Sequence, residues 1–126
     1  MKSLDELMAL PGAIAAFECS GNGALLRHVI ARGSELRPDT LDLVAHMCAA
    51  NLSIATMQAR GWEMTTNTSG FYPIHSCTVV GMDWSVTIVG GAEAEQADAA
   101  PQTLRGLVCA NRKADYEAVT AALAEP

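Results

Sequence analysis

The segment from Asp39 to Arg60, DTLDLVAHMCAANLSIATMQAR, constrains the fold of this chain most, because its pattern predicts one long helix. Pro38 stands directly before it, and Asp39 is placed to accept hydrogen bonds from the free N–H groups of the first turn. No Gly or Pro interrupts the segment before Gly61, and the cation of Arg60 suits the free carbonyl groups of a last turn. We therefore expect a helix from Asp39 to Arg60 that ends at Gly61.

This predicted helix carries two apolar stripes, about 140° apart around its axis, where a surface helix needs only one. One stripe consists of Leu41, Val44, Cys48, Leu52, Ala55 and Ala59. The other consists of Leu43, Met47, Ala50, Ile54 and Met57. The arc expected to face solvent holds Asp42, His46, Ala49, Ser53, Thr56 and Arg60. We interpret one stripe as facing the home sheet and the other as facing a second subunit, without assigning which; the alternative is that long loops of one chain bury both.

Length and composition set the remaining bounds. The 126 residues predict a single domain, 1–126, and a chain that is 50% hydrophobic but only 5% aromatic must build its core from aliphatic side chains. A net charge of -6 argues against nucleic acid or an anionic membrane as the main partner. Neither a signal-peptide pattern nor a membrane-length apolar run occurs in the sequence, so we expect a cytoplasmic protein.

Around the long helix the patterns predict two hairpins, a further strand and two short helices. Ser3 and Glu6 fit a capping box for the first helix, and Tyr116, Val119 and Leu123 recur at helical spacing in the last. The first hairpin pairs two strands across SGNG, read as a type I′ turn, and the second turns at Gly81-Met82-Asp83. The expected strands are Ala13–Cys19, Leu25–Ala31, Tyr72–Val80, Trp84–Val89 and Gly106–Ala110. Gly90 to Thr103, GGAEAEQADAAPQT, is Ala-rich and acidic and is expected to form a loop, at about 90–104.

Pro73 places the Tyr72–Val80 strand at the rim of the sheet, because proline cannot donate to a central ladder. An uncovered rim strand presents free N–H and C=O groups that pair readily with another strand. If two copies pair this strand antiparallel across a two-fold axis, their long helices also meet. The predicted homodimer interface consists of Leu43, Met47, Ala50, Ile54, Met57, Tyr72, Ile74, Ser76, Thr78 and Val80.

The residues that usually carry chemistry do not form a known constellation in this sequence. No nucleophile elbow, phosphate loop or metal-ligand spacing occurs, so we predict no catalytic residues, no metal and no cofactor. The four cysteines are read as free, mostly buried thiols. One alternative stays open: His75 and Cys77 on one face of a strand, with Cys109 close by, would give cysteine or metal chemistry to an accessory subunit of a redox or sulfur-metabolising enzyme complex.

Taken in order, these elements resemble the roadblock/dynein light chain superfamily. The resemblance rests on the segment LPGAIAAFEC, in which Leu10-Pro11-Gly12 is the sharpest motif, on the SGNG turn, on the long central helix, and on the closing unit RGLVCANRKADYEAVTAALA. More specifically, the chain is similar to an uncharacterised subgroup of bacterial roadblock-like proteins. It departs from the family in the acidic loop at 90–104, where members usually have a tight hairpin.

The resemblance implies an α+β sandwich of the roadblock/profilin-like type. Its five-stranded antiparallel sheet would carry the long helix on one face and two terminal helices on the other. It further implies homodimers formed through the third strand and the central helix, which agrees with the two stripes. Family members are non-enzymatic scaffolds or regulators of partner proteins, among them small GTPases. The expected partners are therefore a second copy of the chain and a further protein.

Overall fold

The computed structural model of the chain describes residues 1–90 and 103–126. These residues form a five-stranded sheet with the strand order β2-β1-β5-β4-β3, in which each neighbouring pair is antiparallel. Apart from its end residues, the expected acidic loop at 90–104 lies outside the described part of the chain. The elements in chain order are α1 (Leu4–Leu7), β1 (Ala13–Ser20), β2 (Leu25–Ile30), α2 (Pro38–Thr66), β3 (Ser76–Val80), β4 (Trp84–Val89), β5 (Thr103–Ala110) and α3 (Tyr116–Ala124).

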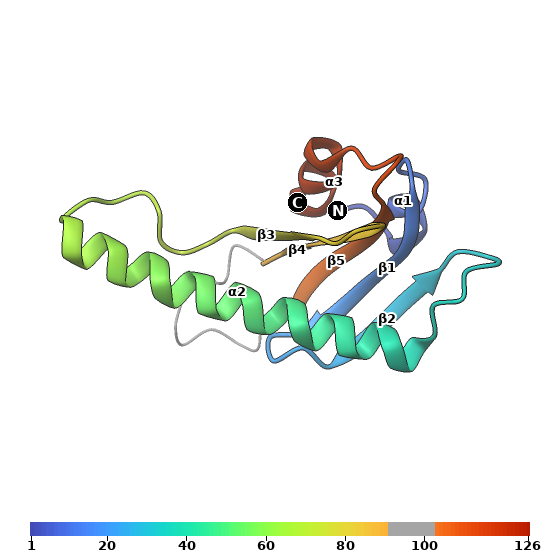
Figure 1. The fold of residues 1–126 in the computed structure, drawn as a ribbon, viewed down its shortest axis with the longest axis horizontal. Coiled ribbons are helices and arrows are strands. Elements are labelled where there is room, and N and C mark those ends of the chain that lie inside the picture. Colours follow the sequence, from blue (N-terminus) through green and yellow to red (C-terminus); the bar gives the residue numbers. More distant parts are fainter. Residues whose placement is uncertain (91–102) are drawn as a thin grey trace.

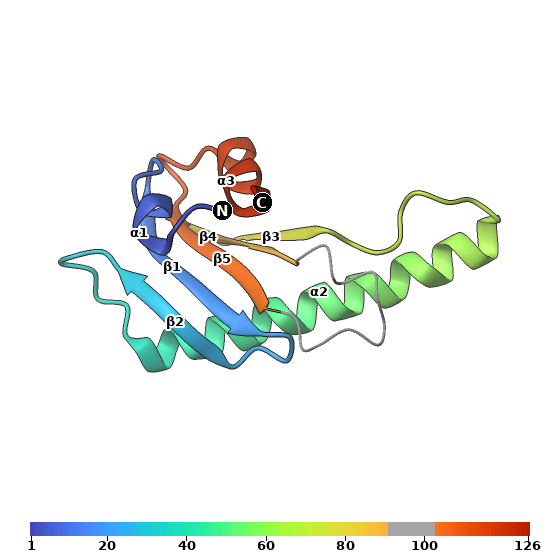
Figure 2. The ribbon, with the colours of Figure 1, turned by 180° about the vertical axis from the view of Figure 1, so that it is seen from behind.

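The sheet separates two layers of helices, as the sequence predicts. The long helix α2 crosses one face, whereas α1 and α3 lie on the other, near both chain ends (Figures 1 and 2). Strands β1 and β5, at the centre, are buried along almost their whole length because both of their faces are covered. The α+β sandwich is confirmed, and β3 is an edge strand as predicted. No helix of the described residues combines the length and the hydropathy needed to cross a membrane.

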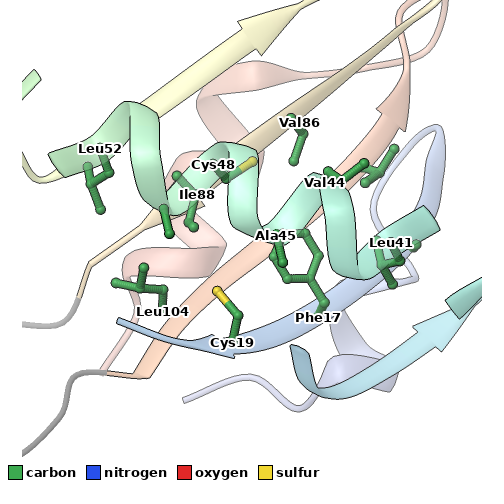
Figure 3. Packing of buried hydrophobic residues seen from close by; sticks show 13 residues of the cluster. Phe17, Cys19, Leu41, Val44, Ala45, Cys48, Leu52, Val86, Ile88 and Leu104 are labelled. Carbon is green, nitrogen blue, oxygen red and sulfur yellow. The ribbon is translucent and has the colours of Figure 1, made fainter. Parts of the chain in front are cut away.

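The core under α2 joins the helix to alternate residues of the strands. In Figure 3, Phe17, Cys19 and Leu104 of the sheet point towards Ala45 and Cys48 of α2. A second apolar cluster fills the opposite face, between the sheet and the terminal helices, and includes Leu4, Leu7, Ala16, Leu107, Cys109, Val119 and Leu123. The period of two along each strand thus divides its side chains between two separate cores.

Helix α2 is longer at both ends than the predicted Asp39–Arg60 helix. Pro38 lies inside the first turn, where its missing N–H is not needed, and Asp39 is not the cap: its Oδ1 accepts from the N–H of Thr40 at 2.9 Å. Gly61 does not end the helix, because a glycine costs an exposed helix only about 1 kcal/mol. The helix ends instead at Asn67, which adopts the left-handed conformation (φ 56°) that terminates helices.

Three further expectations change in detail. The edge strand begins at Ser76 rather than Tyr72, so Pro73 lies in the loop before it, and the last strand is longer than predicted, beginning at Thr103. The predicted type I′ turn about Asn22-Gly23 is not formed, because Asn22 does not have positive φ. Only Gly23 does (φ 96°), and it lies so close to α2 that a Cβ there would stand 2.6 Å from the Cα of His46.

Candidate protein-interaction surface

The structure assigns the two apolar stripes of α2. The Leu41 stripe faces the sheet: Leu41, Cys48 and Ala59 are at most 1% exposed. The Leu43 stripe is uncovered, with exposed fractions of 69% for Leu43, 53% for Ile54 and 73% for Met57; Met47 and Ala50 are exposed as well. The alternative that loops of the same chain bury both stripes is therefore wrong for the described residues. Ala49, expected in the solvent-facing arc, is 4% exposed and packs under the helix.

The orientation of α2 decides which of its flanks faces the β3 edge. The backbone N–H of Leu25 in β2 donates to Asp42 Oδ1 at 2.9 Å, so the Asp42 flank faces β2. Because β2 and β3 are the two edges of the sheet, the opposite flank faces β3. At 100° per residue this flank carries Met47, Asn51, Ile54 and Gln58. Part of the exposed stripe therefore lies beside the β3 edge.

The two edges of the sheet differ in their protection against pairing. Strand β2 carries the charged Arg27, and a charge on an edge strand disfavours the addition of another strand. Strand β3, SCTVV, bears no charge, and Thr78 and Val80 are exposed. Its Ser76, Thr78 and Val80 alternate with Cys77 and Val79, which pack on the α2 side. Among the described strands, β3 is thus the edge suited to accept a second strand.

A further exposed apolar group lies where α2 runs past the sheet (Figure 1). The loop after α2 turns back towards the sheet, and the Glu63 carboxylate holds it to the helix. Glu63 Oε2 accepts hydrogen bonds from the backbone N–H groups of Tyr72 at 3.0 Å and of Phe71 at 2.6 Å. These hydrogen bonds, that of Tyr72 first, lower the pKa of the Glu63 carboxyl. The exposed side chains of this extension are Met57, Trp62, Met64, Phe71 and Tyr72, and we call them the arm.

Most of the arm was not predicted. Of its five residues, the sequence-based interface contains only Met57 and Tyr72. Trp62 and Met64 were missed because the predicted helix ends before them. The remaining predicted interface residue, Ile74, is half-buried and packs against the core under α2. Apart from Met1, Leu26 and Tyr116, every large hydrophobic residue that is exposed in the described chain lies between Leu43 and Trp84. This clustering is typical of a surface that is covered in an assembly.

The proposed chemistry of His75, Cys77 and Cys109 is not supported. Cys77 packs in the core under α2, whereas Cys109 belongs to the core under α1 and α3, so the sheet separates the two thiols. Their expected proximity is wrong because alternate strand residues point to opposite faces. Within the described residues, no three His, Cys, Asp or Glu side chains are grouped so that they could hold a metal ion.

The buried thiols are also poor nucleophiles. Burial raises the pKa of Cys19 to about 11 and that of Cys48 to about 12, and burial raises the pKa of Cys109 as well. A thiol with a raised pKa carries almost no thiolate near neutral pH, and the thiolate is the reactive form. The reading of these three cysteines as buried free thiols is confirmed, whereas Cys77 is only half-buried.

A buried ion pair on the other face was missed by the sequence analysis. Glu18 of β1 lies between Arg27 of β2 and Arg105 of β5, its register neighbours on both sides. Its carboxylate oxygens lie 2.5 Å from Arg27 Nη2 and 3.3 Å from Arg105 Nε. Arg105 also donates to the backbone carbonyl of Lys2 and so ties the amino terminus to the sheet. The only hint in the sequence is a charge within each of two otherwise apolar strands.

Comparison with known proteins places the fold. The model of a family described as an uncharacterised conserved protein, DUF2173, matches residues 3–125. A search of the curated proteins finds no match. Among solved structures, the gliding protein MglB from Thermus thermophilus superposes with a TM-score of 0.66 and 20% identity, covering 96% of this chain and 82% of that one.

Two other solved structures agree with this result. A structure of MglB with a tetrameric arrangement gives a TM-score of 0.68 at 19% identity and covers 96% of this chain and 82% of that one. A Roadblock/LC7 domain from Streptomyces avermitilis gives 0.62 at 13% identity, with coverages of 93% and 81%. At these identities the likeness concerns the fold, and the fold is that of roadblock domains, as the sequence resemblance implies.

Proposed function

The chain belongs to the DUF2173 family of uncharacterised conserved proteins and has a roadblock fold, and from this premise we propose that it is a cytoplasmic, non-enzymatic scaffold that acts as a homodimer. Two copies pair through the β3 edge, continue one sheet across a two-fold axis, and bring their α2 helices together. The assembled surface binds a further protein. Because the resemblance to roadblock proteins includes regulators of small GTPases, we name a small GTPase as the first candidate partner.

One observation carries the proposal of a homodimer: Met47 and Ile54 of the exposed apolar stripe of α2 lie on the flank that faces the unprotected β3 edge of the same molecule. If only the two β3 strands paired, the apolar stripes of the two α2 helices would stay exposed to water. If only the two helices packed together, no main-chain hydrogen bonds would fix how the two copies are aligned. Together they supply main-chain hydrogen bonds and apolar burial to one interface. Because both features belong to one chain, a two-fold axis satisfies both copies at once.

The proposal that the protein is not an enzyme rests on the same residues. Within the described chain, the exposed cluster consists of thioether, aliphatic and aromatic side chains, which suit protein binding, and Tyr72 is its only member with a hydroxyl that could transfer a proton. A solved MglB relative is recorded in a tetrameric arrangement, which supports self-association as a property of this fold.

A pair of charge substitutions on α2 tests the dimer. Ile54→Glu places a carboxylate in the exposed stripe, whereas Ser53→Glu places the same group at the neighbouring exposed position, about 100° around the helix and outside the stripe. Both carboxylates are solvated in a monomer, but only the one introduced by Ile54→Glu would be desolvated in the dimer. Sedimentation analysis should show a dimer for Ser53→Glu and a monomer for Ile54→Glu. Equal dimerisation of both variants would contradict the proposed interface.

The partner is tested by calorimetric titration with the small GTPases of the source organism, each loaded with GDP or with a GTP analogue. We expect one of them to bind the wild-type dimer with affinity that depends on the nucleotide. The Ile54→Glu monomer should bind more weakly, because the assembled surface is lost. If none binds in either state, the partner is of another class and the GTPase proposal fails.

A further inference from the structure

An apolar groove opens on the α2 face of the sheet, at the end where α2 begins. It has a volume of about 400 Å³ and is lined by Ile14, Leu36, Val44, Trp84 and Val108, with Glu35 at its polar side. Trp84 is 43% exposed although it stands at the start of the inner strand β4. The chain therefore builds an apolar concavity next to a tryptophan that it does not cover with its own described residues.

The arm lies at the other end of the same helix. Thr40 lines the groove and Trp62 belongs to the arm, so about 22 residues at 1.5 Å per residue, or roughly 33 Å, separate the two features along α2. The arm extends past the sheet on the side where β3 begins (Figure 2). Both of the tryptophans of the chain are at these two places, Trp62 in the arm and Trp84 at the groove.

A two-fold axis through β3 exchanges these two ends. If β3 pairs antiparallel with its copy about Thr78, the middle of the strand, then Ile74 of one copy, just after the arm, comes opposite Met82 of the other, in the turn that leads into Trp84. The groove lies on the α2 face of the sheet, the arm continues from the far end of α2, and a joined sheet keeps the α2 faces of both copies on one side. Each arm is thereby carried to the groove of the other copy.

We propose that the arm of each copy docks into the Trp84 groove of the second copy, so that each groove is completed only by the partner molecule. This inference rests on the homodimer proposed above and specifies what secures it. Trp, Tyr, Phe and Met are the residue types enriched at the cores of protein interfaces, and the arm consists of them alone. Trp62 acts as the anchor, because tryptophan gives the largest apolar contact per side chain.

Charges at the two ends are complementary. Arg60 lies beside the arm, with its guanidinium 5.6 Å from the centre of the Tyr72 ring, and Glu35 lies at the groove. Among the described residues neither of them forms an ion pair within its own chain. In the docked dimer, Arg60 of each copy approaches Glu35 of the other, so the pair forms once at each end of the interface. This favours the antiparallel pairing about Thr78 over a pairing in a shifted strand register.

Tryptophan fluorescence of the full chain, recorded across a dilution series with acrylamide as quencher, tests this docking. Trp62 is 59% exposed and Trp84 43% exposed in one copy, so both should be quenched readily in the dilute monomer and weakly in the dimer. Trp62→Ala should raise the dimer dissociation constant by about 30-fold or more. Leu26→Ala removes a similarly exposed side chain at the other sheet edge and should change it less than about twofold.

Charge reversal supplies an independent check. Arg60→Glu and Glu35→Arg should each weaken the dimer, and the double variant should regain most of the lost affinity. A wild-type dimer whose tryptophans stay open to acrylamide, and whose affinity is unchanged by Trp62→Ala, would overturn the docking but leave the homodimer standing. A wild-type monomer at all concentrations would overturn both. These two failures give different results in the same dilution series.

Discussion

The ring of Phe17 in β1 occupies the position where a side chain at Gly106 in β5 would stand. The two residues are register partners, and a Cβ built on Gly106 would lie 2.2 Å from Phe17 Cζ. Phe17 is fully buried beneath α2, so its ring has no free space into which it can move. Glycine at this central strand position is thus required by packing, even though glycine weakens a strand by its backbone entropy.

We expect Gly106→Ala to lower the free energy of unfolding by about 1–3 kcal/mol, the usual cost of overpacking a core. Gly61→Ala is the matched control, since Gly61 is helical and nothing lies within 4 Å of its added Cβ. It should raise stability by about 0.5–1 kcal/mol. Urea unfolding at one fixed protein concentration measures both. Equal effects of the two substitutions would contradict the packing of Phe17 on Gly106.

A second glycine pair separates backbone strain from steric contact. Gly23 (φ 96°) and Gly33 (φ 81°) both have positive φ, but only a Cβ at Gly23 would meet another backbone, 2.6 Å from His46 Cα. Gly33→Ala should cost about 1–2 kcal/mol from strain alone. Gly23→Ala should cost more, because α2 must also move away from the turn. Similar losses of stability in urea would show that the turn does not determine where α2 lies.

The buried ion pair gives a prediction about charge. Glu18→Ala leaves the guanidinium of Arg105, 7% exposed, without its carboxylate partner and should destabilise the fold by about 3–5 kcal/mol. Arg27→Ala removes the outer, solvent-exposed member and should cost less than about 1 kcal/mol. Thermal unfolding of both variants checks this order. A larger loss for Arg27→Ala would mean that the outer pair carries the stability.

Buried thiols predict how stability depends on alkaline pH. The folded-state pKa of Cys48, about 12, lies above its ordinary value of 9.0, so the folded state keeps a proton that the unfolded state loses. The stabilisation is complete below about pH 9 and decreases as pH rises towards 12, by about 1.4 kcal/mol per pH unit for each such thiol. Urea unfolding of wild type and Cys48→Ala between about pH 8 and pH 10.5 should give a shallower decline for the variant. Parallel declines would contradict the shift.

The sequence was sufficient for the layers and the sheet edge but not for the ends of α2. Apolar stretches on both faces of β1 and β5 predict a doubly covered sheet, because this pattern depends on a local rule that tertiary contacts did not override. The edge position of β3 is as predicted, but Pro73 lies in the loop before the strand and does not itself mark the rim. The helix was wrongly predicted to end at Gly61. It continues to Thr66, because Glu63 bonds to the returning loop and Asn67 forms the C-cap, and intrinsic helix propensity includes neither contact.

The candidate interface was predictable as a set but not in orientation. The helical period separates two stripes on α2, yet only packing against Phe17 and its neighbours decides that the Leu41 stripe is inside. Trp62, Met64 and Phe71 lie outside the predicted elements, so no periodicity identified them. The separation of Cys77 from Cys109 depends on strand register, which a single sequence does not specify.

The central claim is that this chain is a dimer joined through β3 and α2, and its mass in solution tests this most directly. Size-exclusion chromatography with light scattering at micromolar concentration should give twice the chain mass of 13.2 kDa for the wild type. The same measurement on Ile54→Glu should give the mass of one chain, while Ser53→Glu keeps the doubled mass. A wild-type protein that elutes with the mass of a single chain would contradict the account.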